Sequence, residues 1–244
     1  MNSLAAIDIS HQSDSPKFID WASVSGDLDA HGFAIVPKLL ARAECRSVSD
    51  TYSEDSHFRS RIVMARHGFG CGEYKYFAYP LPDRIAKLRA ELYRDLANIA
   101  NRWNQNMGIA IRYPASHAIF LDRCHKAGQP RPTPLLLQYV AGDYNCLHQD
   151  LYGEHVFPLQ VAILLSEPDR DFEGGEFVLI EQRPRRQSGA AVIPLRQGDA
   201  VVFAVHHRPV RGARGWYRVN LRHGVSKIRS GSRHTLGIIF HDAK

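Results

Sequence analysis

The pattern of hydrophobic and polar positions changes near the middle of the chain. Residues 83–107 place apolar side chains at three- and four-residue steps, which predicts a long amphipathic helix. A second helix is predicted over 39–52, and a short strand after the break at Gly32. Residues 67–79 are rich in glycine, aromatic residues and proline, which predicts a loop or an irregular hairpin. The first half of the chain is therefore expected to be mainly helical.

After residue 113, short apolar runs alternate with turn-forming residues. The runs of strand length cover 118–121, 134–140, 159–165, 176–181, 190–195, 200–205, 219–225 and 235–241. This spacing predicts an antiparallel double sheet or barrel. We expect a loose arm over 1–17 and a single domain over 18–244, in which a helical part (18–113) packs on a β-core (114–244).

Composition and charge indicate where the protein is located more clearly than what it does. The chain has 244 residues, enough to bury a core without a disulfide or a structural metal. Its four cysteines form no CxxC pair, and its N-terminus lacks the pattern of a secretory signal, so we expect reduced thiols and a cytoplasmic location. No apolar run reaches the length of a membrane span, so no membrane association is expected. The net charge of +6 is compatible with a polyanionic partner.

The phrase His148-Gln-Asp150 is the first candidate for chemistry. If these residues leave an extended strand, the imidazole and the carboxylate emerge on the same face and can bind one metal ion. A third ligand must come from elsewhere in the fold. Two histidines and one carboxylate leave three metal positions open, which is the arrangement that non-haem iron(II) oxygenases use.

The third ligand has to be chosen among 13 histidines. His223 is favoured because it lies in a strand-like run near the end of the chain, ten residues before Arg233. The planar fork of an arginine matches a carboxylate in a bidentate pair. HxD alone arises often by chance, whereas HxD followed by His-x9-Arg within a series of strands is more specific. Five other histidines of the β-region are less well placed: His155, His206, His207, His234 and His241.

Two further phrases add to these elements: Glu173-Gly-Gly-Glu-Phe177 and Gln197-Gly-Asp-Ala-Val-Val-Phe203. Together the elements resemble the iron(II)/2-oxoglutarate dioxygenase superfamily, and the resemblance covers residues 117–242. The resemblance implies an α+β fold whose C-terminal core is a double-stranded β-helix, or jelly roll. It also implies oxidative decarboxylation of 2-oxoglutarate by O2, coupled to hydroxylation of a C–H bond, with no catalytic residue beyond the metal site.

The resemblance assigns roles to six residues. The implied iron(II) ligands are His148, Asp150 and His223, and the implied cosubstrate residues are Arg233, Thr235 and Tyr139. Arg233 would pair with the distal carboxylate of 2-oxoglutarate, and either hydroxyl would add a hydrogen bond.

The ending from Arg222 to Ala243 is similar to a bacterial branch grouped with the AlkB-type enzymes, which oxidatively demethylate alkylated nucleic-acid bases. Nucleic acid is therefore a candidate partner, and the arginines of the C-terminal half could contact its phosphates. The loop over 66–79 places aromatic faces beside cations, as base stacking requires. Its candidate substrate residues are Arg66, Phe69, Tyr74 and Tyr76.

One departure from the AlkB pattern favours a different substrate. AlkB-type enzymes carry a second arginine six residues beyond the cosubstrate arginine, and Ile239 stands there in this chain. The His-x9-Arg spacing is that of prolyl-hydroxylase-like members, so hydroxylation of a small molecule or a protein side chain is the alternative. A third interpretation is a cupin-like binding domain without enzymatic activity. The sequence indicates no particular protein partner.

Overall fold

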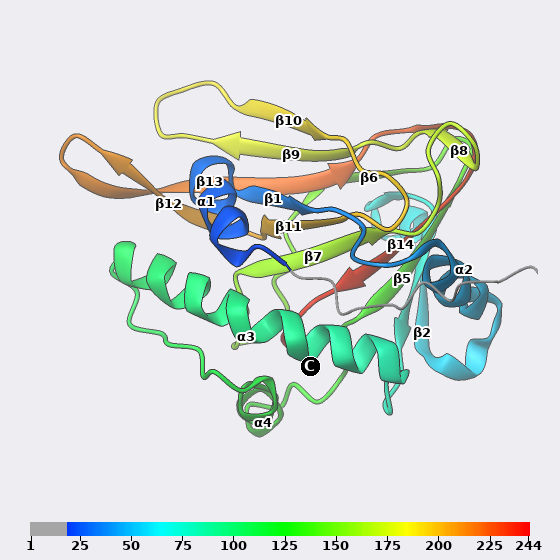
Figure 1. Ribbon diagram of the computed structural model, residues 1–244, viewed down its shortest axis with the longest axis horizontal. Helices are drawn as coiled ribbons and strands as arrows, with labels where there is room; N and C mark the ends of the chain where they lie inside the picture. The colour runs from blue at the N-terminus through cyan, green and yellow to red at the C-terminus, as the bar shows by residue number, and fades with distance from the viewer. Residues whose placement is uncertain (1–18) are drawn as a thin grey trace, which may run out of the picture.

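The computed structural model describes residues 19–244 and contains two antiparallel sheets with helices along one side (Figure 1). The arm expected over 1–17 lies outside the described residues. The α-helices are α1 (Trp21–His31), α2 (Arg42–Asp50), α3 (Asp83–Asn106) and α4 (His117–Lys126). Three short 3-10 helices are η1 (Thr51–Ser53), η2 (Asp55–His57) and η3 (Met64–His67). Within the described part of the chain, no helix is long and apolar enough to cross a bilayer.

The larger sheet contains β1 (Phe33–Val36), β2 (Phe58–Val63), β4 (Glu73–Phe77), β5 (Leu135–Val140), β7 (Leu159–Leu164), β8 (Phe172–Gly174), β11 (Ala200–Ala204) and β14 (Ile228–Ile238). Its order is β1-β11-β7-β14-β5-β4-β2, and β8 pairs with β14. The smaller sheet contains β3 (Gly70–Cys71), β6 (Tyr144–His148), β9 (Phe177–Gln182), β10 (Gly189–Ile193), β12 (His207–Gly212) and β13 (Gly215–Val225). Its order is β10-β9-β13-β6-β3, and β12 pairs with β13.

Every strand predicted from residue 134 onward is present, as β5, β7, β9, β10, β11, β13 and β14. The predicted strand at 118–121 is wrong, because these residues lie within α4. Their apolar positions belong to a helical spacing in which His117, Phe120 and Cys124 are buried together. A short apolar run cannot by itself distinguish a buried strand from part of a helix. The predicted α+β class with an antiparallel double sheet is confirmed.

The N-terminal part supplies strands as well as helices. β1 follows the predicted glycine break and pairs with β11, while β2 and β4 extend the opposite edge of the larger sheet. Residues 67–79, expected to form a loop or an irregular hairpin, contain β3 and β4, which belong to different sheets and do not pair with each other. Gly72 between them has φ +113°, and a Cβ there would lie 2.8 Å from the Tyr139 ring. The sheets thus draw on residues from both sides of the boundary at 113, and the single domain over 18–244 stays a prediction.

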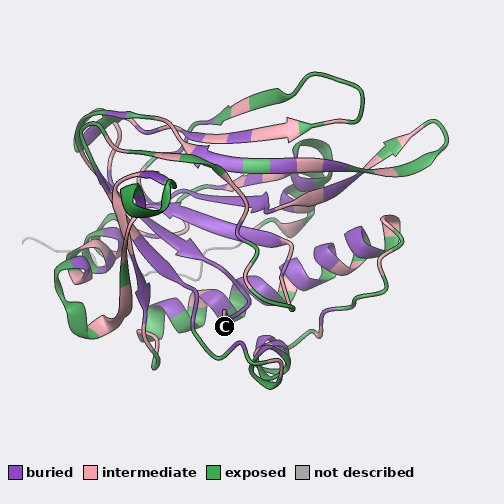
Figure 2. Ribbon diagram, turned by 180° about the vertical axis from the view of Figure 1, so that it is seen from behind, coloured by how far each residue is buried: buried purple, intermediate pink, exposed green. Residues whose placement is uncertain are grey.

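The core lies between the two sheets and beneath α3, where buried residues concentrate (Figure 2). The predicted helix over 83–107 is confirmed as α3, whose apolar stripe includes the buried Leu92, Leu96 and Trp103. Between the sheets, the rings of Phe177 on β9 and Phe203 on β11 lie 5.0 Å apart. This packing brings the inner face of β13 against the inner face of the larger sheet.

Candidate metal centre and cosubstrate pocket

The three predicted metal ligands meet at one end of the smaller sheet. His148 ends β6 and is the register partner of His223 on β13, so the two imidazoles lie side by side with ring centroids 4.2 Å apart. Asp150 follows His148 by two residues, and its side chain therefore returns to the same face. Its Oδ1 lies 3.5 Å from His148 Nε2, and its Oδ2 lies 3.4 Å from His223 Nε2.

These distances fit a single metal ion. The ligand atoms of His148, Asp150 and His223 lie within 4.8 Å of one another, and no other group in residues 19–244 gathers three such ligands. Adjacent ligands at about 2.1 Å from one octahedral ion lie about 3.0 Å apart. His148 Nδ1 donates to the Cys146 carbonyl at 2.8 Å, which leaves the Nε2 lone pair for a metal.

The surroundings favour the protonation states that metal ligands need. Burial raises the pKa of Asp150, but the hydrogen bond with His223 and the charges of both histidines outweigh it and hold the pKa well below its ordinary value. Burial and the charge of His148 lower the pKa of His223. At neutral pH the carboxylate is therefore ionised and His223 is neutral. The His223 ring packs beside the rings of Phe177 and Phe203, with centroid distances of 5.9 and 4.6 Å.

A cavity of about 320 Å³ opens beside the metal ligands, between the two sheets. Apolar atoms form most of its wall surface, and its polar groups converge from both sheets. The polar and charged residues that line it are His148, Asp150 and His223 with Tyr74, Tyr139, Asn145, Gln149, Tyr152, Gln160, Arg233 and Thr235. The three predicted metal ligands and the three predicted cosubstrate residues therefore share one cavity.

Arg233 is a buried cation without a carboxylate partner. Its side chain is 2% exposed, and it forms no ion pair with the described residues. Nη1 donates to Thr235 Oγ1 at 2.6 Å, while Nε has no hydrogen-bond partner within residues 19–244. Burial lowers the pKa of Arg233 to about 10, so the guanidinium stays charged at neutral pH. A buried charge of this kind requires an anionic partner.

Tyr139 and Thr235 flank this guanidinium. Tyr139 on β5 is the register partner of Arg233 on β14, and the centroid of its ring lies 5.7 Å from the guanidinium carbon. Its buried hydroxyl makes no hydrogen bond of ordinary geometry to the described residues. An anion that reaches Arg233 would therefore find the Tyr139 phenol and the Thr235 hydroxyl beside it. The cavity suits a small dicarboxylate that extends from Arg233 to the metal centre.

The predicted substrate residues separate into two pairs. Phe69 and Tyr74 line the cavity. Arg66 lies exposed on η3. Tyr76 does not line the cavity, and it packs in a small buried cluster with Leu135, which does.

Two further residues of the cavity were not identified from the sequence. Gln160 is the one polar residue of β7, and its buried Oε1 has no partner among the described residues. A lone glutamine in an otherwise apolar strand is the signal that could have revealed it. Tyr152 Oη donates to Asp150 Oδ1 at 2.8 Å and so orients a metal ligand. A tyrosine two residues after HxD carries no such signal by itself.

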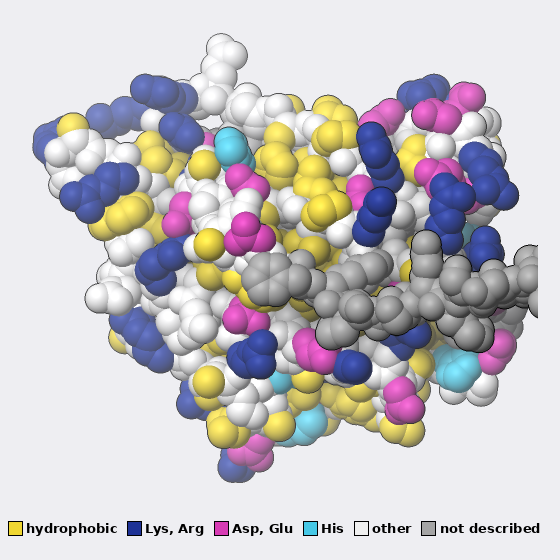
Figure 3. Space-filling model, viewed as in Figure 1, with side chains coloured by type: hydrophobic (Ala, Val, Ile, Leu, Met, Phe, Trp, Pro, Cys, Tyr) yellow, Lys and Arg dark blue, Asp and Glu magenta, His cyan; other side chains and the backbone are white. Residues whose placement is uncertain are grey.

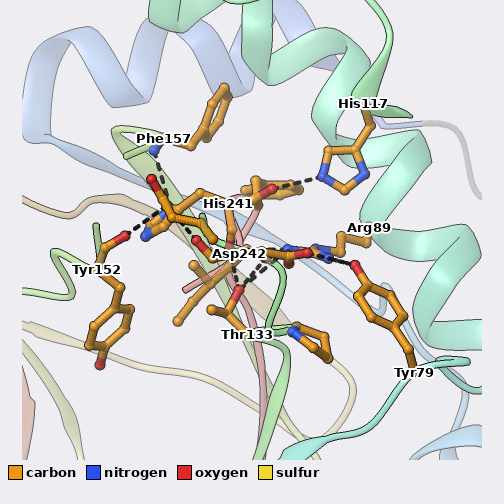
Figure 4. A network of polar contacts seen from close by, with 12 residues as sticks. Tyr79, Arg89, His117, Thr133, Tyr152, Phe157, His241 and Asp242 are labelled. Atoms are coloured by element: carbon orange, nitrogen blue, oxygen red, sulfur yellow. Dashed lines mark hydrogen bonds and ion pairs between the residues drawn. The ribbon is translucent and has the colours of Figure 1, made fainter. Parts of the chain in front are cut away.

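A polar network joins α3 to the end of the chain and to the loop after Asp150 (Figure 4). Arg89 Nη2 of α3 donates to Asp242 Oδ1 at 2.8 Å, and Arg89 Nε donates to the Ile239 carbonyl at 2.8 Å. Gln129 Nε2 donates to the carbonyls of Asp242, at 2.6 Å, and Tyr152, at 3.1 Å. The network thereby fixes the loop that presents Tyr152 to the carboxylate of Asp150.

A protein-family model and one relative each match about two thirds of the chain or more. Residues 72–243 match the model of the Oxygenase-NA family, described as an oxygenase catalysing oxidative methylation of damaged DNA. An uncharacterized protein of Mycobacterium tuberculosis is 51% identical over 167 residues, which are 68% of this chain and 72% of that protein.

Two solved structures have a similar fold. A prolyl-4-hydroxylase of Pseudomonas putida aligns with a TM-score of 0.53 and 14% identity, over 92% of this chain and 99% of that one. A Burkholderia pseudomallei oxidoreductase of the 2OG-Fe(II) oxygenase family aligns with a TM-score of 0.53 and 15% identity, over 94% and 95%. The expected jelly-roll fold is confirmed by these likenesses.

Proposed function

The chain belongs to the Oxygenase-NA family and is an oxygenase of the iron(II)/2-oxoglutarate superfamily, and we propose that it hydroxylates a C–H bond of an alkylated nucleic-acid base. His148, Asp150 and His223 would hold iron(II), and Arg233 with Tyr139 and Thr235 would hold 2-oxoglutarate. When bound, iron and 2-oxoglutarate activate O2 and supply the oxidant, with release of succinate and CO2. Hydroxylation of an N-methyl group would then release formaldehyde and restore the base.

The observation that carries the cosubstrate assignment is the unpaired guanidinium of Arg233. A structural arginine buried this deeply would have a carboxylate partner, as Arg89 has in Asp242. Arg233 instead faces a cavity that it shares with the metal ligands. A dicarboxylate would neutralise it at one end and leave its other end for the metal centre.

The protein residues have three tasks in the proposed reaction. Tyr152 fixes one oxygen of Asp150, so the carboxylate presents its remaining lone pairs to the metal. Phe177 and Phe203 pack against the His223 ring and hold its orientation. Phe69 and Tyr74 offer aromatic faces in the cavity wall, on which an extruded base could stack.

A second candidate function is hydroxylation of a protein side chain. The spacing of nine residues between His223 and Arg233 favours it, since this is the spacing of prolyl-hydroxylase-like enzymes. Ile239 also replaces the second arginine of AlkB-type enzymes, and it packs in a small buried cluster with Tyr76 and Leu135.

The two candidates differ in what the enzyme releases. We expect formaldehyde and unmodified base when the protein is incubated with N-methylated oligonucleotides, iron(II), 2-oxoglutarate and ascorbate in air. Asp150→Ala is the matched control and should release neither. Succinate formation stimulated by a proline-rich peptide, with no formaldehyde from any methylated oligonucleotide, would favour the second candidate instead.

A further inference from the structure

The outer face of the smaller sheet carries a concentration of arginine. Between Gln182 and Arg222 the sequence has nine arginines and a single acidic residue, Asp199. The hairpins β9–β10 and β12–β13 project from the same end of the molecule (Figure 1), and Lys and Arg side chains gather over this end (Figure 3). A shallow groove of about 300 Å³ runs there, which we call the arginine groove. Its lining residues are Gln182, Arg183, Pro184, Arg185, Arg186, His207, Arg218 and Asn220.

The positive charge of the arginine groove is largely uncompensated. Glu181 pairs with Arg183 and with the buried Arg208, so its charge is already compensated. Arg185 and Arg186 form no ion pair with residues 19–244 and are exposed. The pKa of His207 is low, chiefly because of burial and further because of the positive charge of Arg218. His207 is therefore neutral at neutral pH, and the arginines supply the positive charge of the groove. Such a surface attracts a polyanion.

An aromatic platform continues the groove toward the tip of the β12–β13 hairpin. Trp216 is 43% exposed, and the Arg211 guanidinium lies 5.4 Å from the centre of its ring. Trp216, Arg218 and Asn220 alternate along β13 with the half-buried Tyr217 and the buried Val219 and Leu221, so they share its outer face. From Trp216 to Asn220 this strip is about 13 Å long. Cations beside an exposed aromatic face are what a single nucleic-acid strand binds.

The groove is also connected to the metal cavity. Gln149 lies between the two ligands of the HxD phrase, and it lines the cavity. Its Nε2 donates to Asn220 Oδ1 at 2.7 Å and to the Leu221 carbonyl at 2.6 Å. Asn220 lines the arginine groove. One hydrogen bond therefore joins a residue of the groove to a residue of the metal cavity. β13 carries His223 on its inner face and Arg218 on its outer face.

We infer that the arginine groove binds the sugar-phosphate backbone of a single-stranded nucleic acid whose target base enters the metal cavity. This inference rests on the proposed function, and it adds where the strand lies. Arg185, Arg186 and Arg218 contact phosphates, and Trp216 stacks on a base beyond the target. The contacts read no sequence, because they address phosphates and an aromatic face only.

The test measures binding of a fluorescent single-stranded DNA of about 12 nucleotides by anisotropy, over a range of salt concentrations. Arg185→Glu/Arg186→Glu should weaken binding at least tenfold at low salt. It should also make the slope of log K against log salt shallower by about 1.4, since each phosphate contact on a single strand contributes about 0.7. Trp216→Ala should weaken binding about tenfold and leave the slope unchanged.

The matched control is Arg94→Glu/Arg170→Glu, which makes the same change of net charge at two exposed arginines outside the groove. It should retain wild-type affinity to within about threefold. Wild-type affinity in the groove variants, or an equal loss in the control pair, would overturn the inference.

A parallel titration with Mn(II) and 2-oxoglutarate separates the two proposals. All four proteins, wild type included, should bind the cosubstrate equally, because no substituted residue lines the metal cavity. Failure of the wild type to bind 2-oxoglutarate would contradict the proposed function. Unchanged DNA affinity in the groove variants would overturn only the groove.

Discussion

Arg233 is the residue that carries the assignment of the cosubstrate site. Its spacing from His223 identified it as a carboxylate-binding candidate, because the residue type and the position could both be read from the chain. The lack of a carboxylate partner could not be predicted, since it depends on which side chains the sheets bring around β14. That absence is the stronger argument for a bound anion.

Replacing Arg233 with methionine should separate ligand binding from stability. Methionine fills similar space without the desolvation cost of an unpaired charge. The free energy of unfolding, measured with urea, should therefore stay within about 1 kcal/mol of wild type or rise. A loss of about 3 kcal/mol would mean that Arg233 has a structural partner and that its role as an anion site is wrong.

His117 provides a residue-scale test by pH. It is buried, its Nε2 donates to the Phe240 carbonyl at 2.8 Å, and burial lowers its pKa to about 4. Its folded pKa lies below its unfolded value, so its contribution to stability is complete above about pH 6.5 and is lost as the pH falls toward 4. The slope is at most about 1.4 kcal/mol per pH unit.

We therefore expect His117→Gln to unfold with a weaker pH dependence than wild type between pH 6.5 and 4. Glutamine can donate the same hydrogen bond to Phe240 but does not titrate. Urea unfolding at several pH values measures the difference. Identical slopes for the two proteins would show that His117 is not held neutral by burial.

At the scale of elements, the sequence predicted the helices and strands that bury one continuous face, because such a face produces a regular spacing of apolar residues. α3 and the strands from β7 to β14 with apolar runs are of this kind. β6 was not predicted, because its residues are mostly exposed or half-buried and form no apolar run. Its conformation comes from pairing with β13, which is a contact between distant parts of the chain. The strand predicted over 118–121 is wrong, because four consecutive apolar residues do not distinguish the period of a strand from that of a helix such as α4.

The contact between α3 and the C-terminal segment should be an important source of stability. Arg89 and Asp242 are 2% and 0% exposed at their side chains, and they pair at 2.8 Å. Among residues 19–244, Arg89→Ala leaves the buried Asp242 carboxylate with His125 and Tyr79 as its side-chain partners, and it should cost about 3–5 kcal/mol.

The matched control lies on the same helix. Arg94 pairs with Asp95 at the surface, and Arg94→Ala should cost less than about 1 kcal/mol. Urea denaturation of both variants provides the comparison. Similar losses for the two substitutions would contradict the importance of the buried pair.

At the scale of the whole molecule, the candidate site exists only where the two sheets pack together. The smaller sheet supplies His148 and His223, while the larger sheet supplies Tyr139 and Arg233. The sequence identified these residues by motif and resemblance, but it could not place them around one cavity. It also missed Gln160, whose polarity matters only because β7 borders that cavity.

The most direct test of the account is an anaerobic titration with iron(II), followed by 2-oxoglutarate, of the wild type, Asp150→Ala and Arg233→Met. The wild type should bind both ligands. Asp150→Ala should lose iron and, with it, most of its affinity for 2-oxoglutarate, whereas Arg233→Met should keep iron at wild-type affinity and lose 2-oxoglutarate. Equal binding of both ligands by all three proteins would contradict the assignment of His148, Asp150, His223 and Arg233 to one dioxygenase site.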